Sequence, residues 1–144
     1  MIAFCPLPSA FPARGLPLVP GVSDNSRQSL GILGENLAVD ALRARGYAIL
    51  ARRHRSRHGE IDIIAEDGAC VVFVEVKLRT TDLFGEAFEA IPRWKQRRII
   101  SVAIDYLSRN GLLDRPVRFD VAAIDERAGA LEVELIEDAF TEDG

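Results

Sequence analysis

The sequence predicts a single α/β domain in which a central mixed β-sheet is flanked by helices. Two segments repeat apolar residues every three or four positions, as amphipathic helices do, and others show the short apolar or alternating runs of β-strands. These segments follow the order helix, strands, helix, strands, which favours a sheet with helices packed against it. The length of 144 residues also suits one domain, because domains usually contain roughly 100–150 residues.

The N-terminal residues differ in composition from the rest of the chain. Residues 1–28 are rich in Pro, Ser and Gly and lack hydrophobic periodicity, so we expect a flexible leader there and the folded domain over 29–144. The domain opens with a helix whose apolar residues recur over 30–44, and Gly46 is a typical helix stop.

The remaining segments predict pairs of strands on either side of a second helix. Strands are expected over 60–65, 70–78, 117–124 and 131–136. Pro92 suits the first turn of a long helix that ends at Asn110-Gly111. The segment 80–89 is expected to be a loop that leads into a short helical turn.

The first strand pair is predicted to be a β-hairpin, because Asp67-Gly68 separates its two apolar runs. With these two residues as the turn, Glu60 faces Glu75 and Asp62 faces Phe73. Side chains alternate between the two faces of a strand. One face of the hairpin is therefore expected to carry Glu60, Asp62, Phe73, Glu75 and Lys77.

The acids on this face need a compensating charge, because like charges opposite one another destabilise a sheet. Two carboxylates about 5 Å apart repel each other by roughly 3 kcal/mol at an effective dielectric constant near ~20. Solvent, Lys77 or a bound divalent cation could offset this repulsion, and a shell of oxygens suits Mg²⁺ rather than zinc. The alternative is the solvated face of an antiparallel sheet, although Phe73 among the charges argues against uniform solvation.

A further acid, Glu35, falls in the apolar sector of the first helix. On a helical wheel it lies between Val39 and Leu42, nearly opposite the polar side. A carboxylate buried there must be paired, protonated or linked to a metal, because burying it alone is costly. The alternatives are an acid in the first turn that the helix dipole favours, or an exposed local environment.

Basic residues are concentrated in two places, although the chain has a formal net charge of −4. The acidic balance excludes binding of nucleic acid by bulk charge alone. Residues 43–58 nevertheless contain six arginines, two histidines and no acid, and Arg93, Lys95, Arg97 and Arg98 open the second helix. Each cluster could hold a phosphate backbone, and the alternative for each is a solvated face.

Several classes of protein are excluded or disfavoured. No stretch reaches the roughly 18–20 apolar residues of a membrane span, and prolines interrupt the apolar N-terminus, so we expect no membrane association and no secretory signal. Cys5 and Cys70 lack metal-ligand spacing and are expected to be free thiols in a cytoplasmic protein. Trp94 and Tyr106 are expected to be packing residues.

Short motifs along the chain resemble one family. They are Gly34-Glu35, Gly59-Glu60-Ile61-Asp62, Phe73-Val74-Glu75-Val76-Lys77, Lys95-Gln96 and Arg118-Phe119-Asp120. Together they resemble the YraN family of uncharacterised bacterial proteins over roughly residues 31–140. That family is similar to the PD-(D/E)XK nuclease superfamily, which implies a restriction-endonuclease-like fold.

The resemblance implies a role for each matching position. Asp62, Glu75, the carbonyl of Val76 and Glu35 would bind Mg²⁺ or Mn²⁺, and Lys77 would activate water and stabilise charge on the phosphate. Glu35, Asp62, Glu75 and Lys77 would thus be the catalytic residues. The expected nucleic-acid-binding residues are Arg52, Arg53, Arg55, Arg57, Lys95 and Gln96.

The chain departs from the family pattern at two positions. Ile61 stands where the superfamily motif has proline, and Arg53 stands where the resemblance leads us to expect asparagine. The first departure is shared by YraN-like sequences, whereas the second weakens any specific role for that loop.

The leading hypothesis is a Mg²⁺-dependent nuclease that hydrolyses phosphodiester bonds in DNA, with structured or branched DNA as a candidate substrate. The alternative is a nucleic-acid-binding module of the same fold with little or no catalytic activity. A scaffold that uses the acidic C-terminal part would leave the acid and lysine cluster unexplained. DNA is the expected partner, and the sequence leaves a homodimer as an open alternative.

Overall fold

The computed structural model describes residues 3–5, 27–79, 91–127 and 129–141. Its elements are β1 (Ala3–Phe4), α1 (Arg27–Ala44), β2 (Ala48–Ser56), β3 (Gly59–Asp67), β4 (Cys70–Arg79), α2 (Arg93–Arg109), β5 (Pro116–Arg127) and β6 (Ala130–Phe140). The sequence showed only a short apolar run at the start of β2. The strand continues from there through the arginines of the basic run as far as Ser56. The expected loop over 80–89 lies outside the described residues.

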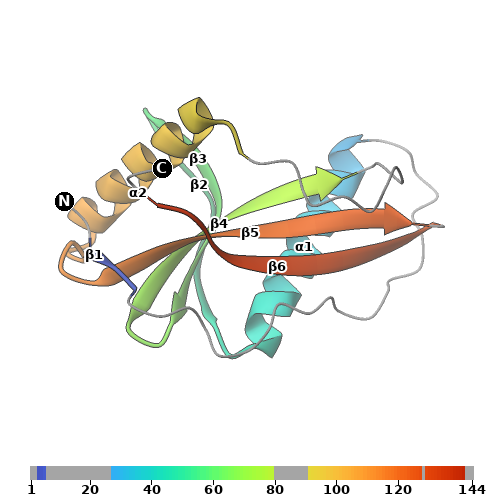
Figure 1. Cartoon of the computed structure of the whole chain (residues 1–144), viewed down its shortest axis with the longest axis horizontal. Helices are drawn as coiled ribbons and strands as arrows, with labels where there is room; N and C mark the ends of the chain where they lie inside the picture. The colour runs from blue at the N-terminus through green and yellow to red at the C-terminus, as the bar shows by residue number, and fades with distance from the viewer. Residues whose placement is uncertain (1–2, 6–26, 80–90, 128, 142–144) are drawn as a thin grey trace.

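The described strands form one mixed sheet in the order β1-β5-β4-β3-β2, with β6 paired to β5 (Figure 1). The central pair, β4 and β5, is parallel, whereas β3 pairs antiparallel with both β2 and β4. Parallel strands need a crossover connection, and α2 lies on the segment that joins β4 to β5. The predicted α/β domain with a mixed sheet is confirmed.

Each helix covers one face of the sheet, as Figure 1 shows. On the α1 face, Ala38 and Leu42 pack with alternate strand residues such as Val72 and Val74. On the α2 face, the buried set includes Phe73, Phe119, Ile99, Val102 and Leu107. The central strands are therefore buried on both sides, which explains their nearly continuous apolar sequences.

The β3–β4 hairpin forms, but its turn is not where the sequence placed it. Asp67 pairs with Cys70, so the connecting residues are Gly68 and Ala69. Gly68 has φ +60, the left-handed conformation that glycine adopts readily in two-residue hairpin turns. The predicted register was therefore wrong by two residues, and Phe73 faces Ile64 instead of Asp62.

The first residues of the chain belong to the sheet. Ala3 and Phe4 pair in parallel with the start of β5, and the Cys5 N–H donates to Val117 O at 3.0 Å. Cys5 is joined to Cys70 by a disulfide, so the expectation of two free thiols was wrong. Most of the expected leader lies outside the described residues, but residues 3–5 and the start of α1 belong to the fold.

The disulfide leads to a direct chemical prediction. Alkylation of the denatured, unreduced protein should modify neither cysteine, because both sulfurs are bonded to each other. After reduction, both cysteines should react, and mass spectrometry would measure the difference. Full alkylation before reduction would contradict the linkage, and a Cys5→Ser variant with one reactive thiol provides the control.

Candidate active site

Asp62 lies where strands β3 and β4 separate. The paired ladder ends at Ile63 and Val74, and beyond it Asp62 Oδ2 accepts the Val76 N–H at 2.8 Å. Strand alternation is broken at this point, because Ile61 packs in the α2-side core whereas Ile63 packs in the α1-side core. The expectation that every acid and Lys77 would share one regular face was therefore too simple.

Glu75 is the neighbour of Asp62 in this gap, although the sequence paired it with Glu60. Glu75 is only 9% exposed, and Lys95 Nζ at the start of α2 lies 2.5 Å from its Oε2. The pKa of Asp62 is raised to about 7, mainly by burial and then by the charge of Glu75, while the hydrogen bond from the Val76 N–H opposes the shift. The two carboxylates thus form a buried acidic pair, and Lys95 offsets the charge of Glu75.

Glu35 is buried as its wheel position predicted, at 6% exposure. It lies in the middle of α1, not in its first turn, so the helix dipole does not account for it. Two arginines of β2 neutralise it: Arg52 NH2 lies 2.9 Å from Oε1, and Arg53 Nε lies 3.0 Å from Oε2. The sequence left Glu35 as a paired, protonated or metal-linked carboxylate, and in this structure it is ion-paired.

Arg53 adopts a backbone conformation that is unusual for its residue type. Its φ is +51, in the left-handed region that asparagine and glycine tolerate better than long side chains. This is the position at which the sequence departs from the expected asparagine. The Arg53 side chain connects β2 to α1 through its ion pair with Glu35.

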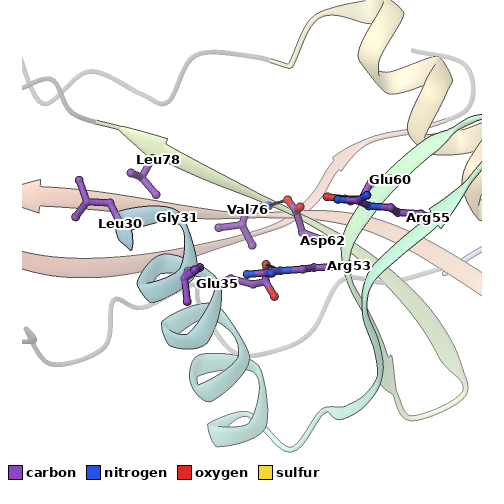
Figure 2. Close-up of a pocket in the computed structure, with 10 residues that line it drawn as sticks. Leu30, Gly31, Glu35, Arg53, Arg55, Glu60, Asp62, Val76 and Leu78 are labelled. Carbon is purple, nitrogen blue, oxygen red and sulfur yellow. Dashed lines mark hydrogen bonds and ion pairs between the residues drawn. The ribbon is translucent and has the colours of Figure 1, made fainter. Parts of the chain in front are cut away.

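A pocket of about 520 Å³ opens between the start of α1 and the ends of β2, β3 and β4. Figure 2 shows the side chains of Glu35, Arg53 and Asp62 meeting around it, with Arg55 paired to Glu60 at its other side. The full lining is Leu30, Gly31, Ile32, Glu35, Arg53, Arg55, Glu60, Asp62, Val76 and Leu78. The charged part of the lining thus combines two arginines with three acids, and each of these arginines is ion-paired to a glutamate.

The predicted metal ligands are brought together only in part. Among the described residues, no three His, Cys, Asp or Glu side chains converge closely enough to hold a metal ion. Asp62 and Glu75 do form a pair, whereas Glu35 is turned to its arginines. The chemistry of that pair fits a divalent cation, because two neighbouring carboxylates supply hard oxygen ligands.

Most of the predicted nucleic-acid-binding residues have partners within the chain. Arg52, Arg53 and Arg55 form ion pairs with glutamates, and the side-chain amide of Gln96 donates to Ile91 O at 2.8 Å. In the described part of the chain, Arg57 forms no ion pair with a carboxylate and donates to His58 instead. Among the four arginines predicted to bind nucleic acid, Arg57 is thus the one without an ion pair to a glutamate in the described part of the chain.

Sequence reasoning missed two features near this site. One is the contact between Lys95 and Glu75, which joins residues from distant segments. The other is the exposure of Trp94, which was expected to pack and is instead 55% exposed. The signal for the second was present, because Trp94 falls among arginines on the polar side of α2.

The fold and the site together define a single mixed α/β domain with a buried carboxylate pair followed by a lysine on the central strand. Residues 34–124 match the uncharacterised protein family UPF0102. A UPF0102 protein of Geotalea uraniireducens is 47% identical over 114 residues, covering 78% of this chain and 90% of the relative. One from Anaeromyxobacter dehalogenans is 41% identical and covers 86% and 92%.

The chain therefore belongs to the UPF0102 family, and the YraN-like resemblance is confirmed. A relative from Symbiobacterium thermophilum is 46% identical over 112 residues and carries the same family name. None of the described helices is long and apolar enough to cross a membrane.

Proposed function

We propose that this protein is a metal-dependent nuclease that hydrolyses phosphodiester bonds in DNA. The observation that carries the proposal is the buried pair of Asp62 and Glu75 at the point where β3 and β4 separate. A buried pair of acids destabilises a fold unless a charge compensates it, and such arrangements are concentrated at functional sites.

Each residue of the site has a chemical task in this proposal. Asp62 and Glu75 would hold Mg²⁺ or Mn²⁺, which when bound would polarise the phosphate and lower the pKa of a water. Lys77 lies two residues after Glu75 on β4, and its ammonium would orient that water and stabilise charge on the phosphate. Arg53 and Arg55, at the pocket, would receive the phosphate backbone.

Removal of the acidic or basic groups tests the assignment. We expect Glu75→Gln and Lys77→Met each to lower the rate of Mg²⁺- or Mn²⁺-dependent DNA cleavage by at least about 100-fold, because each removes a charge that acts in the transition state. Asp105→Asn is the matched control, since Asp105 pairs with Arg109 on the exposed side of α2. Equal cleavage by all four proteins would indicate a contaminating nuclease and overturn the proposal.

A second candidate is a DNA-binding module with little or no activity. It is supported by the cations that already neutralise the site, with Lys95 on Glu75 and two arginines on Glu35. Binding of linear and branched DNA in Mg²⁺, without cleavage of either, would favour this second candidate.

Arg57 provides a test of binding that does not depend on cleavage. Arg57→Gln should weaken DNA binding at all sequences and reduce the slope of log K against log salt by about 0.9, the value for one lost phosphate contact. Arg109→Gln is the control, because that arginine is already paired with Asp105. An unchanged salt slope in the Arg57 variant would show that the β2–β3 turn does not contact the DNA phosphates.

A further inference from the structure

Trp94, the only tryptophan of the chain, lies on the surface in the first turn of α2. Its side chain is 55% exposed, whereas tryptophan is usually among the most buried residues on average. The inner side of the same helix is formed by Ile99, Val102 and Leu107. Trp94 thus contributes little to the core, and its exposure calls for an explanation other than packing.

One face of the Trp94 ring is already covered by a cation. The guanidinium carbon of Arg98, one turn further along α2, lies 5.3 Å from the ring centre. The stem of Arg98 lies over Gly59, where an added Cβ would come within 2.8 Å of its Cγ and Cδ. Because Gly59 has no side chain, Arg98 can lie against the turn between β2 and β3 and hold the tryptophan in place.

This contact joins the two basic segments of the sequence into one surface. Figure 1 places α2 alongside β2 and β3, and the Arg98–Gly59 contact is where they meet. Residues 93–98 contain four cations and no acid, and Arg57 lies two residues before Gly59. Among the described residues, Arg93 and Arg97 form no ion pair with a carboxylate.

We propose that Trp94 is a stacking platform for an unpaired base of single-stranded DNA, whose phosphates contact the surrounding arginines. Base stacking on an exposed aromatic ring within a basic surface is how proteins bind single strands without sequence preference, and Arg98 strengthens such a stack from the opposite face. The proposal rests on the proposed function for the class of ligand and deepens it by naming single-stranded or unpaired segments.

The position of the platform connects it to the candidate active site. Lys95, the residue after Trp94, contacts Glu75, so the first turn of α2 carries the platform and also borders the buried acidic pair. A base that stacks must be unpaired, and the partially single-stranded arms of branched DNA supply such bases. Charge complementarity favours nucleic acid over an apolar protein partner, because four of the six residues 93–98 are cationic.

The single tryptophan makes the test direct, because intrinsic fluorescence reports Trp94 alone. In EDTA, oligothymidylate of about twelve nucleotides should quench the emission, since a stacked base lies on the ring. An abasic strand of the same length carries the same phosphates without bases and should bind without quenching. Equal quenching by the abasic strand, or no binding of either strand at low salt, would overturn the proposal.

Variants separate stacking from charge. Trp94→Ala should weaken oligothymidylate binding about ten-fold and leave the affinity for the abasic strand unchanged, whereas Trp94→Phe should retain part of the affinity. Ile104→Ala removes another exposed apolar side chain of α2 and should have no effect. Circular dichroism checks that each variant is folded. Wild-type affinity in Trp94→Ala would contradict the platform.

The platform and the nuclease proposal can be overturned separately. The wild type could show quenching, and Trp94→Ala a loss of affinity, although the protein does not cleave DNA. That result would support the platform and count against the nuclease. A protein that cleaves DNA but binds oligothymidylate equally with or without Trp94 would keep the nuclease and overturn the platform.

Discussion

Replacing Asp62 by Asn is expected to abolish DNA cleavage and, in the metal-free protein, to make the fold more stable at neutral pH. Asn keeps an oxygen that can accept the Val76 N–H but removes the charge that Glu75 repels. We expect a loss of at least about 1000-fold in rate and a gain of about 1–3 kcal/mol in the free energy of unfolding. If Asp62 served only the structure, its replacement by Asn would lower the free energy of unfolding.

The pH dependence of the stability gain follows from the direction of the pKa shift. In the folded protein the pKa of Asp62 is raised from its usual 3.8 to about 7. The folded state therefore binds the proton more tightly than the unfolded state, and wild-type stability falls as the pH rises between these values. The advantage of Asp62→Asn should be absent below pH ~4, grow up to pH ~7 and then remain constant.

Thermal unfolding in EDTA, measured for both proteins from acidic to neutral pH, checks this expectation. Mg²⁺ should then raise the unfolding temperature of the wild type more than that of Asp62→Asn, because a ligand that binds only the folded state stabilises it. Asp105→Asn, outside the site, should follow the wild type throughout. A variant that is less stable than the wild type at neutral pH would show that Asp62 is a structural acid.

The positions of the helices and central strands could be predicted from the sequence because burial imposes them. The alternating sets of β4 face two separate cores, and the stripe of α2 faces one of them. The burial of Glu35 was also visible, because a helical wheel depends only on spacing. Local patterns are sufficient where one residue's environment follows from its neighbours in sequence.

The features that could not be predicted depend on tertiary pairing or on small differences in turn energy. Asp67-Gly68 and Gly68-Ala69 both provide a glycine for a tight turn, and a shift of two residues keeps every side chain on its face, so hydrophobicity did not distinguish them. The Cys5–Cys70 disulfide requires β1 to join β5, a contact between residues far apart in sequence. No local pattern contains that information.

The ion pairs of the candidate site belong to the same class. The sequence showed that Glu35 needs a partner, but Arg52 and Arg53 reach it only because β2 passes beside α1. Lys95 was predicted to contact nucleic acid, and in this structure its ammonium lies on Glu75. Charge type can be predicted from sequence, whereas the choice of partner is set by the fold.

The sequence also did not indicate that Arg118, near the start of β5, is the centre of a buried ionic network. Arg118 and Asp120 are each 3% exposed. Arg118 donates to both oxygens of Asp120 at 2.9 and 3.0 Å, to Asp67 at 3.1 Å, and to the hydroxyl of Tyr47. Burial raises the pKa of Tyr47, so its hydroxyl stays neutral and can accept this bond.

Arg118→Met is therefore expected to destabilise the fold by about 3–5 kcal/mol, because it leaves Asp120 buried without its counter-ion. Changing Asp120 to Asn in the same chain should recover part of that loss, since the uncompensated charge is then removed. The exposed pair of Arg109 and Asp105 is the matched control, and breaking it should cost less than about 1 kcal/mol. Urea unfolding of the two single variants and the double variant measures the coupling.

The outcome also separates a structural network from a second catalytic site. Arg118 pairs along the ladder with Val72, near the β3–β4 turn, whereas Glu75 pairs with Val121 further along the same strands. Folded Arg118→Met should consequently cleave or bind DNA as the wild type does, at a temperature well below its unfolding transition. Loss of activity with unchanged stability would contradict the structural role, because an uncompensated Asp120 cannot be buried without a loss of stability.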